Sequence, residues 1–316
     1  MSFEFYPADL PSEAVEAQVM AGLSRTPKTI APKFFYDETG SQLFEAITRL
    51  PEYYPTTTEI SIFERYGQAM AEQIGPDCTL IEYGSGNSEK IRTLLDAVRP
   101  TVYAPLDISA DFLRSAGESL HAERSSLNIK ACVVDYTSEV ELPFEPIGRR
   151  VAFFPGSSIG NFEPAEAAQF LGRARRLVDD TGALLLGVDL KKDPAVLHAA
   201  YNDAAGVTAE FNLNVLMHLN NIVGTNFDVS AFEHVAFYNE RLGRIEMHLE
   251  SKVKQTVRMG EWSATFAAGE RIHTENSHKF DHAQVVREAA LAGFGQHVVW
   301  RDPKNWFAVY LLHNQV

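Results

Sequence analysis

The sequence has few cysteines, a shortage of positive charge and no long hydrophobic run. Two cysteines in 316 residues fit neither a disulfide scaffold nor a four-ligand zinc site. Both, Cys78 and Cys132, stand in apolar, strand-like stretches, so we expect buried thiols in a reducing compartment. Nowhere do about 18 uncharged apolar residues follow one another, so the pattern predicts no membrane-spanning helix.

Positive charge is scarce throughout the chain. The 28 Lys and Arg are outnumbered by 42 Asp and Glu, which gives a formal net charge of −14 and a pI near 5.2. Phosphate backbones and anionic lipid surfaces attract clustered Lys and Arg, so we expect neither nucleic acid nor a membrane as a partner. The first residues, MSFEFYPADL, lack the basic segment and apolar core of a signal peptide. We therefore expect a cytoplasmic protein.

The central part of the chain alternates apolar strands with helical stretches. Apolar runs predict strands at residues 78–82, 101–106, 129–134, 150–155 and 182–190. Helical spacing of apolar residues predicts helices at residues 88–98, 109–120 and 164–178, with Ser109 as an N-cap. Strands and helices that alternate in this way form a parallel, doubly wound sheet. Such a sheet binds ligands outside the carboxyl ends of its strands.

The C-terminal end departs from this alternation. Residues 297–303 and 306–313 are apolar runs separated by a short Pro-Lys-Asn turn, which predicts an antiparallel hairpin. A parallel sheet that ends in such a hairpin is the layout of Rossmann-like class I methyltransferases, which use S-adenosylmethionine. We therefore expect an α/β methyltransferase domain from residues 57–190 and 279–316. Residues 1–56 and 191–278 are expected to form a second, α+β domain that binds the substrate and covers the cofactor site.

A glycine-rich turn follows the first central strand. Glu82-Tyr-Gly84-Ser85-Gly86 stands before a predicted helix that includes Lys90. Glycines let the backbone approach a ligand closely, and a helix N-terminus offers free N–H groups. The third glycine of a dinucleotide-binding motif is missing, because Glu89 takes its place. Taken alone, the turn fits a methyl-donor site and an ordinary tight turn about equally.

Polar residues end the next three strands. Asp107 lies about 20 residues past the glycines, where a carboxylate suits a ribose diol, although it also suits a helix N-cap. Asp135 and Tyr136 follow the third strand, where a carboxylate and a ring suit adenine. Gly156 and Asn161 follow the fourth strand at the position that faces the transferred methyl group, although Asn161 also suits a turn cap. Together these strand ends favour a site for S-adenosylmethionine.

Longer motifs carry a resemblance to a known family. They are Phe35-Tyr36-Asp37 with Gly40-Ser41, the segment from Ile47 through Tyr53 to Thr56, the glycine turn through Lys90, Gly156-Ser-Ser-Ile-Gly-Asn161, Tyr201, and Thr274-Glu275-Asn276-Ser277. Over almost its whole length the sequence resembles the L-histidine Nα-methyltransferases of ergothioneine biosynthesis. These enzymes convert histidine to its trimethylated betaine, hercynine, with S-adenosylmethionine as methyl donor. The resemblance implies that fold, that activity and L-histidine as the small-molecule substrate.

The resemblance also assigns roles to single residues. The positions that match cofactor contacts are Gly84, Ser85, Gly86, Lys90, Asp107, Asp135 and Tyr136. The positions that match substrate contacts are Tyr36, Tyr53, Asn161, Tyr201, Thr208, Met247, Glu275 and Ser277. Among these, Asn161 and Tyr36, with the backbone at Gly156, are expected to hold and orient the reacting amine and so to form the catalytic group.

Glu275 is the expected specificity residue. An imidazole has two nitrogens, and Glu275 can accept from one N–H while Ser277 donates or accepts at the other. Without the resemblance, Thr274-x-x-Ser277 before an apolar-periodic run indicates the start of a helix, with Glu275 as a first-turn carboxylate.

Simpler roles stay open for several of these residues. Tyr36 and Tyr201 also fit core aromatics, and Lys90 also fits a solvated helix lysine. The ten histidines show no metal-ligand spacing, so we predict no metal.

Two other functions stay open as well. One is a methyltransferase of the same superfamily that acts on another amine, such as an indole amino acid. The Glu275 and Ser277 pair suits an indole poorly, because an indole has one N–H and no acceptor nitrogen. The other is a regulator that binds the cofactor without catalysis. The retention of pocket residues from both expected domains argues against it. We expect a monomer.

Overall fold

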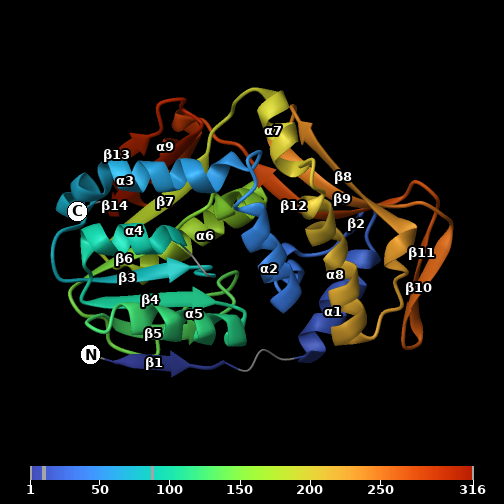
Figure 1. The fold of residues 1–316 in the computed structure, drawn as a ribbon, viewed down its shortest axis with the longest axis horizontal. Helices are drawn as coiled ribbons and strands as arrows, with labels where there is room; N and C mark the ends of the chain where they lie inside the picture. Colours follow the sequence, from blue (N-terminus) through green and yellow to red (C-terminus); the bar gives the residue numbers. More distant parts are fainter. Residues whose placement is uncertain (1, 9–11, 87–88, 315–316) are drawn as a thin grey trace. The chain divides into compact units, whose positions relative to one another are not determined.

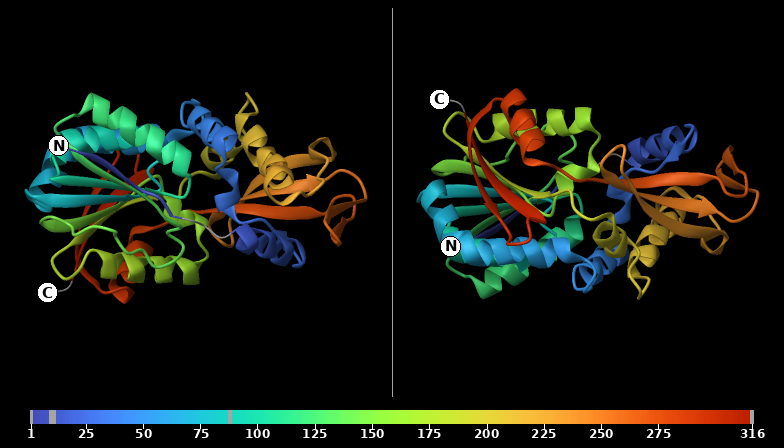
Figure 2. Two further views of the ribbon diagram at one scale, coloured as in Figure 1. Left: turned by 90° about the horizontal axis from the view of Figure 1, so that it is seen from below. Right: turned by 90° about the horizontal axis from the view of Figure 1, so that it is seen from above.

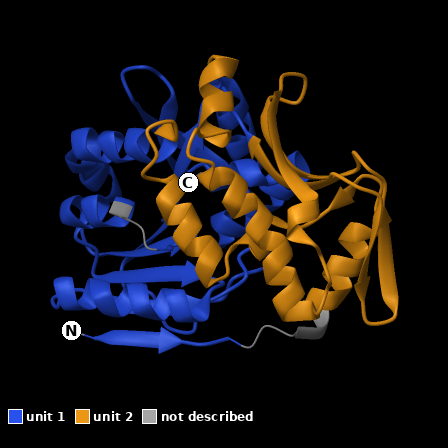
Figure 3. Ribbon diagram, turned by 45° about the vertical axis from the view of Figure 1, so that its right-hand side comes forward, with its two compact units in different colours: residues 1–8, 55–191, 278–316 blue, residues 9–54, 192–277 orange. Residues whose placement is uncertain are grey.

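The computed structural model describes residues 2–8, 12–86 and 89–314, and it divides the chain into two compact units. Unit 1 comprises residues 1–8, 55–191 and 278–316, and unit 2 comprises residues 9–54 and 192–277 (Figure 3). Each unit is therefore assembled from segments that lie far apart in the sequence.

The core of unit 1 is an eight-stranded sheet with the order β1-β5-β4-β3-β6-β7-β14-β13 (Figure 1). The strands are β1 (Phe3–Tyr6), β3 (Cys78–Tyr83), β4 (Val102–Asp107), β5 (Asn128–Val133), β6 (Arg149–Phe154), β7 (Ala183–Asp189), β13 (Phe294–Arg301) and β14 (Phe307–Asn314). The first six strands in this order are parallel, whereas β14 pairs antiparallel with both β7 and β13. The chain runs outward from β3 in one direction and from β6 in the other, so the switch point lies between β3 and β6.

Helices cover both faces of this sheet. They are α3 (Tyr54–Ile74), α4 (Glu89–Val98), α5 (Ala110–Glu123), α6 (Pro164–Leu177) and α9 (His282–Leu291). Figure 2 shows α3, α4 and α5 on one face and α6 and α9 on the other. Every residue of β3 and β7 is consequently buried, which is why parallel strands of this kind have continuous apolar sequences.

Two apolar cores result, one on each face. On the first, Ile62 and Met70 of α3 pack with Leu94 of α4 and with Leu80 and Phe153 of the sheet. On the second, apolar residues of α6 and α9 pack against the other side of β6, β7 and β14. Helix α6 begins with Pro164 and has a capping box, in which the side chains of Glu163 and Glu166 each accept from the backbone N–H of the other residue.

Unit 2 contains a four-stranded sheet of order β2-β12-β9-β8 and a separate β10-β11 hairpin. The strands are β2 (Lys28–Thr29), β8 (Phe232–Asn239), β9 (Arg244–Ser251), β10 (Gln255–Met259), β11 (Trp262–Phe266) and β12 (Arg271–His278). The helices are α1 (Ser12–Leu23), α2 (Glu38–Ile47), α7 (Pro194–Tyr201) and α8 (Val207–Val223). Helix α8 contacts β8 and β9 of the sheet and also packs against α2. Short 3₁₀ turns, η1 (Pro32–Phe35), η2 (Ser158–Asn161) and η3 (Val229–Ala231), complete the two units.

The central α/β architecture confirms the expected fold class. The strands and helices predicted for residues 101–190 and the C-terminal hairpin are present, with ends that differ by a few residues. The predicted start of a helix at Ser88 lies outside the described residues. Ser109 is the N-cap of α5, but its side chain makes no capping bond. None of the helices in the described part of the chain is both long and apolar enough to cross a bilayer.

The N-terminal residues differ from the expectation. We placed residues 1–56 together in the second domain, but Phe3–Tyr6 form β1, which pairs in parallel with β5 at the edge of the central sheet. Phe3 and Phe5 pack against a small core of Leu113, Ala131 and Val133. A strand of four residues whose partner lies about 120 positions later leaves no periodic signal in the sequence.

Candidate functional site

The glycine turn links β3 to α4 at the carboxyl ends of the central strands. The backbone N–H groups of Gly84 and Ser85 both donate to the carbonyl of Leu106 on β4, at 2.8 and 3.1 Å. Gly84 and Gly86 have φ angles of 64° and 48°, in the left-handed region that glycine adopts without strain. The turn is thus fixed to the neighbouring strand by its backbone. Asn87 and Ser88 of the same motif lie outside the described residues.

Asp107, the last residue of β4, faces this turn. Its Oδ2 accepts from the Gly86 N–H and its Oδ1 accepts from the Ser109 N–H, both at 3.0 Å. Burial raises the pKa of Asp107, although these backbone hydrogen bonds oppose the rise. Each carboxylate oxygen has a further lone pair, so the group can still accept from a ligand hydroxyl. Asp107 therefore acts as a local cap and is also placed to bind a ligand.

Tyr136 lies over the glycine turn at the end of β5. An added Cβ at Gly84 would stand 3.6 Å from the Tyr136 ring, an ordinary contact, so it is the positive φ of Gly84 that favours glycine here. Tyr136 also packs edge-on against Tyr83 and Phe154, with ring centroids 6.0 and 5.7 Å apart. Burial raises the pKa of Tyr136, which keeps its hydroxyl protonated. The neighbouring Asp135 accepts from the Thr137 N–H at 3.0 Å.

A buried carboxylate that the sequence analysis missed connects two of the predicted residues. Glu59 of α3 has no exposed side-chain surface and pairs with Lys90 Nζ at 2.8 Å. Its two oxygens also accept from the Gly156 N–H, at 3.1 and 2.9 Å. Gly156 has a φ of 72°, and a Cβ there would stand 3.0 Å from Lys90 Nζ. Lys90, which we expected to face a ligand carboxylate or solvent, is thus held by Glu59 next to Gly156.

The loop after β6 is tied to β7 as well. Ser157 has a left-handed φ of 60°, and its Oγ accepts from the Asp189 N–H at 2.9 Å. The Asp189 carboxylate pairs with Lys279 Nζ at 2.9 Å, and both side chains are only 1% exposed. Asn161 is the last residue of η2, which directly follows this loop. The loop that carries Gly156 and Asn161 is therefore anchored from two sides.

These groups fit the S-adenosylmethionine that the sequence pattern implies. The Oγ of Ser85 is buried and has no hydrogen-bond partner among the described residues, and a buried hydroxyl in that state calls for a partner. Backbone N–H groups near a helix start suit the amino acid part of the ligand. Asp107 suits the ribose, and Tyr136 supplies a ring beside the place for adenine.

In unit 2, predicted tyrosines form a chain of aromatic contacts. Tyr36 lies edge-on to Phe44 at 5.9 Å, Phe44 to Tyr53 at 6.3 Å, and Tyr53 to Tyr201 at 6.2 Å between ring centroids. Phe211 of α8 contacts both Tyr36 and Phe44. The structure thus brings together three of the predicted substrate residues, through two phenylalanines that the sequence analysis did not select.

Local contacts explain why Phe35, Tyr36, Asp37 and Gly40 occur together in the sequence. The Asp37 carboxylate caps α2 by accepting from the Gly40 N–H at 2.7 Å, and it also accepts from Asn214 of α8 at 2.8 Å. A Cβ at Gly40 would overlap the Phe35 carbonyl. The motif therefore fixes the place of Tyr36 between η1 and α2.

Tyr201 meets Ser277 although 76 positions separate them. The Tyr201 hydroxyl donates to Ser277 Oγ at 2.7 Å, and the two residues are 7% and 5% exposed. Ser277 and Glu275 lie on β12, so the reading of this segment as a helix start is wrong. The helical reading failed because the alternating burial of β12 was masked by polar residues on both of its faces.

Thr208 and Met247 occupy other elements of unit 2. Thr208 lies in the first turn of α8, where its N–H donates to Asp203 at 2.8 Å. Met247 is buried on β9, and its carbonyl oxygen lies 3.1 Å from Thr274 Oγ1.

A buried polar network connects these elements. Thr274 Oγ1 donates to Asn212 Oδ1 at 2.8 Å, and Asn212 Nδ2 lies 2.9 Å from His234 Nδ1. His234 Nε2 in turn donates to the Tyr201 carbonyl at 3.0 Å. Burial lowers the pKa of His234, against the opposing effect of the Tyr201 carbonyl. The network links β12, α8, β8 and α7 through Asn212 and His234, which carry no motif signal.

Glu59 has a signal in the sequence by which it could have been predicted. Glu59 stands three and four positions before Ile62 and Phe63, on the apolar stripe of an amphipathic helix. A carboxylate on such a stripe must find a buried partner. Asn212 and His234 had no comparable signal, because their partners come from distant segments.

Comparison with known proteins agrees with this geometry. Residues 15–314 match the family described as histidine-specific, SAM-dependent methyltransferases. A histidine N-alpha-methyltransferase of Mycolicibacterium smegmatis is 45% identical over 311 residues, covering 96% of each chain. One of Mycobacterium tuberculosis is 43% identical over 305 residues, covering 94% of each chain. Ergothioneine biosynthesis protein 1 of Neurospora crassa is 32% identical over 286 residues, or 87% of this chain and 32% of that protein. This chain therefore belongs to the family of histidine-specific, S-adenosylmethionine-dependent methyltransferases.

Proposed function

We propose that this protein transfers three methyl groups from S-adenosylmethionine to the α-amino group of L-histidine, forming hercynine in a first step of ergothioneine biosynthesis. The observation that carries the proposal is the extent of the family match, residues 15–314, which includes almost all of both units. A match limited to unit 1 would support only methyl-donor binding, because many unrelated functions share this type of sheet.

Unit 1 holds the methyl donor in this proposal. Gly84, Ser85 and Gly86 supply backbone and hydroxyl donors, and Asp107 accepts from the ribose hydroxyls. Asp135 and Tyr136 bind the adenine. Lys90 is held near Gly156 by Glu59, 2.8 Å away, and supplies positive charge for the ligand carboxylate.

Unit 2 binds the histidine. Tyr36 and Tyr201 donate their hydroxyl protons to the substrate carboxylate, for which Tyr201 exchanges its present acceptor, Ser277 Oγ, for the ligand. Tyr53, Thr208 and Met247 line the pocket. Glu275 accepts from one imidazole N–H, and Ser277 completes the hydrogen bonding of the ring. A pocket built on such polar groups rejects analogues that leave them unpaired, by up to about 10⁴-fold.

For this reaction the chain has to position the two reactants and does not have to supply a reacting group. When bound, the sulfonium supplies an electrophilic methyl group whose C–S bond breaks with both electrons passing to sulfur. Asn161 and the backbone near Gly156 orient the amine lone pair in line with the methyl carbon. The substrate ammonium loses one proton before the first transfer, and the methylated amine loses one more after each of the first two rounds, all to solvent water. Tyr36 keeps the substrate carboxylate in place while spent donor is exchanged.

Mass spectrometry of the product tests the proposal. Purified protein is incubated with S-adenosylmethionine and L-histidine, and in parallel with L-tryptophan as the matched indole substrate. We expect histidine to gain three methyl groups and tryptophan to stay unmodified. Unmodified histidine would overturn the proposed function, and faster methylation of tryptophan would overturn the assigned role of Glu275.

A further inference from the structure

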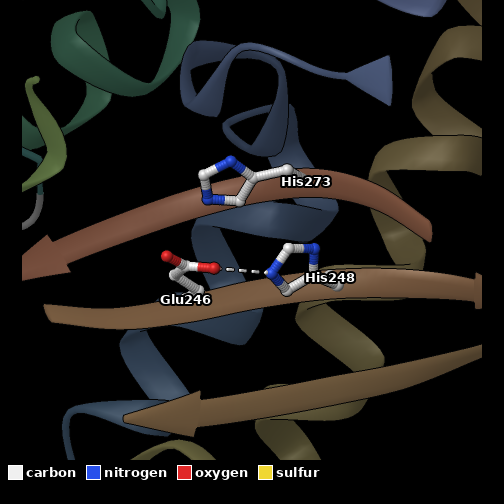
Figure 4. Close-up of side chains that lie close together, drawn as sticks. All are labelled: Glu246, His248 and His273. Atoms are coloured by element: carbon white, nitrogen blue, oxygen red, sulfur yellow. Dashed lines mark hydrogen bonds and ion pairs between the residues drawn. The ribbon is translucent and has the colours of Figure 1, made fainter. Parts of the chain in front are cut away.

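Three potential metal ligands come together in unit 2, outside the residues assigned to methyl transfer. Glu246 and His248 lie on β9 and His273 lies on the neighbouring strand β12. One ligand atom from each residue lies within 4.8 Å of the others. Figure 4 shows the three side chains close together on the two strands, with a contact drawn between Glu246 and His248.

The fold explains why these side chains meet. Residues two apart on a strand point to the same face of a sheet, so Glu246 and His248 project together. The His248 and His273 rings stack with centroids 4.8 Å apart and an interplanar angle of 22°. Phe237 of β8 stacks on the other side of His248 at 5.4 Å. The cluster is therefore held in place by ring packing across three adjacent strands.

We propose that Glu246, His248 and His273 form a binding site for one divalent transition-metal ion of the zinc class. Two imidazole nitrogens and one carboxylate oxygen are the donor set that zinc, cobalt and nickel accept, whereas calcium and magnesium require oxygen ligands. Ligands about 2.1 Å from a tetrahedral ion lie about 3.4 Å from one another. Glu246 Oε2 and His248 Nε2, 3.1 Å apart, already have nearly this spacing.

His248 is almost enclosed, and only its Nε2 faces Glu246. The Nδ1 atom of His248 is buried and has no hydrogen-bond partner among the described residues, and the whole side chain is only 12% exposed. An imidazole nitrogen without a partner in such a place costs free energy.

Hydrogen bonds hold Glu246 and His273 in place, while the nearly parallel His248 and His273 rings have to turn about their Cβ–Cγ bonds to direct one nitrogen each at a shared ion. Glu246 Oε1 accepts from Arg244 Nε at 2.9 Å and from Asn239 Nδ2 at 3.0 Å, so Oε2 is the oxygen left for the cluster. His273 Nε2 donates to the Glu275 carbonyl at 3.1 Å. Hydrogen bonds of this kind around the ligands fix their orientation and raise metal affinity.

Burial and neighbouring groups shift the pKa values of all three residues. Burial, together with the nearby His273, lowers the pKa of His248 to about 4, and burial also lowers the pKa of His273. Burial would raise the pKa of Glu246, but hydrogen bonds from Arg244 and His248 outweigh it and lower the pKa. Both rings are therefore neutral and the carboxylate is ionised.

The positive charges near the cluster are compensated. Arg244 is paired with Glu246 itself, and Arg271 of β12 pairs with Glu250 of β9 at 2.7 Å. Both arginines are therefore paired with a carboxylate, which reduces their repulsion of a bound cation.

Metal titration of the complete, untagged chain tests the site. The protein is first treated with a chelator, and Co²⁺ is then added while its ligand-field absorption is followed, with Zn²⁺ binding measured by calorimetry. We expect one Co²⁺ or Zn²⁺ per chain, no comparable binding of Mg²⁺, and a rise in Tm when Zn²⁺ is present.

Variants locate the bound ion. His248→Phe retains a ring that stacks between Phe237 and His273 but has no nitrogen, so it should fold and bind Co²⁺ at least tenfold more weakly. Glu246→Gln, which keeps an oxygen for Arg244, should also weaken binding. His297→Gln is the matched control, because His297 lies in unit 1 near His282, with ring centroids 5.5 Å apart, and should leave binding unchanged.

The proposal is overturned by either of two results. One is the absence of Co²⁺ binding to the wild-type chain, or binding that His248→Phe leaves intact. The other is binding that disappears in His297→Gln, which would place the ion at the His282 and His297 pair. Circular dichroism of each variant in the presence of chelator confirms that a loss of binding is not a loss of fold. None of these readouts depends on methyl transfer.

Discussion

At the scale of single residues, the Glu59 carboxylate is fully buried in unit 1 and holds two other groups in place. A buried charge is tolerated only with a partner and with its lone pairs occupied. Lys90 and the Gly156 N–H meet both conditions. Gly187 of β7 provides the space, since a Cβ there would overlap Glu59 Oε1. Glu59 therefore links α3, α4, β6 and β7 through one side chain.

Glu59→Gln should destabilise the protein and weaken its binding of the methyl donor. The amide keeps the volume but leaves Lys90 without its buried partner, and breaking such a pair costs about 3 kcal/mol. Urea unfolding gives the loss in free energy, and calorimetry with S-adenosylhomocysteine gives the change in affinity. The matched control is Glu72→Gln on the exposed face of the same helix, for which both quantities should stay near wild type. Equal behaviour of the two variants would show that the link through Glu59 has no energetic role.

Asn161→Ala should abolish most turnover while leaving the affinity for S-adenosylhomocysteine nearly unchanged. In the proposed function, the Asn161 amide orients the amine, and a misplaced nucleophile costs about 10²-fold in rate. Single-turnover assays with histidine measure the chemical step, and calorimetry measures donor binding. Near-wild-type turnover would remove Asn161 from the mechanism, and a large loss of donor affinity would instead give it a structural role in unit 1.

At the scale of secondary-structure elements, His234 joins α7, α8 and β8 through a fixed pattern of donors. Asn212 Nδ2 also donates to the His248 carbonyl at 2.9 Å, so the amide is oriented and its nitrogen faces His234 Nδ1. Nδ1 must therefore accept, while Nε2 donates to the Tyr201 carbonyl. A second proton on the ring would set two N–H donors against each other.

Stability should consequently fall when the solution becomes acidic. The folded-state pKa of His234 lies below its unfolded value of about 6.5, because the ring is buried. Its contribution to stability is complete above about pH 6.5 and is lost as the pH falls from there toward the folded-state pKa. Asp203, whose charge opposes the shift, limits the size of the effect.

The measurement is the difference in Tm between pH about 7.5 and pH about 5.5, on either side of the unperturbed histidine pKa of about 6.5, with chelator present. His234→Gln can still accept and donate in the network but does not titrate. We expect a smaller drop in Tm for this variant than for the wild type. An identical drop in the two proteins would show that His234 has no part in the acid sensitivity.

The sequence predicted strands such as β3 and β7 but not β12, for a physical reason. Strands such as β3 and β7 are buried on both faces, so their apolar runs are visible in one local window. β12 carries Thr274, Glu275 and Asn276 in succession, because its polar residues meet partners on both faces. Local polarity then indicates a turn or a helix end. The strand becomes evident only with its neighbours in place.

The same limit applies to the candidate sites. Gly84, Asp107 and Tyr136 were selected because each follows a predicted parallel strand, and such strand ends share one edge of a sheet. The His248 and His273 cluster was not found, because 25 positions separate residues that strand pairing brings together. For the tyrosines, the family resemblance rather than any periodic pattern chose Tyr36, Tyr53 and Tyr201. Their shared aromatic contacts give that choice a structural basis.

At the scale of the whole molecule, the net charge of −14 should affect the binding of two ligands differently, although both occupy the same proposed site. S-adenosylmethionine carries a sulfonium charge that S-adenosylhomocysteine lacks, so the first has a net positive charge near neutral pH and the second has none. A negative protein attracts the cation over distances beyond contact, and salt screens that attraction. Histidine, a zwitterion near neutral charge, gains little from the same field.

Raising the salt concentration should therefore weaken the binding of S-adenosylmethionine and leave the binding of S-adenosylhomocysteine almost unchanged. The change from about 0.01 M to about 0.1 M salt shortens the screening length from about 30 Å to about 10 Å, so the long-range part of the attraction is largely lost. We expect the Kd of the methyl donor to rise about two- to fivefold, a small effect because only one charge is involved. Calorimetric titration of the wild-type chain with each ligand at both salt concentrations measures it. The two ligands share their adenosine and amino acid parts, so any effect of salt on the fold or on the turn at Gly84 would change both Kd values equally. Parallel changes would assign the salt effect to the protein structure, whereas a change limited to the sulfonium ligand would assign it to the field of the whole molecule.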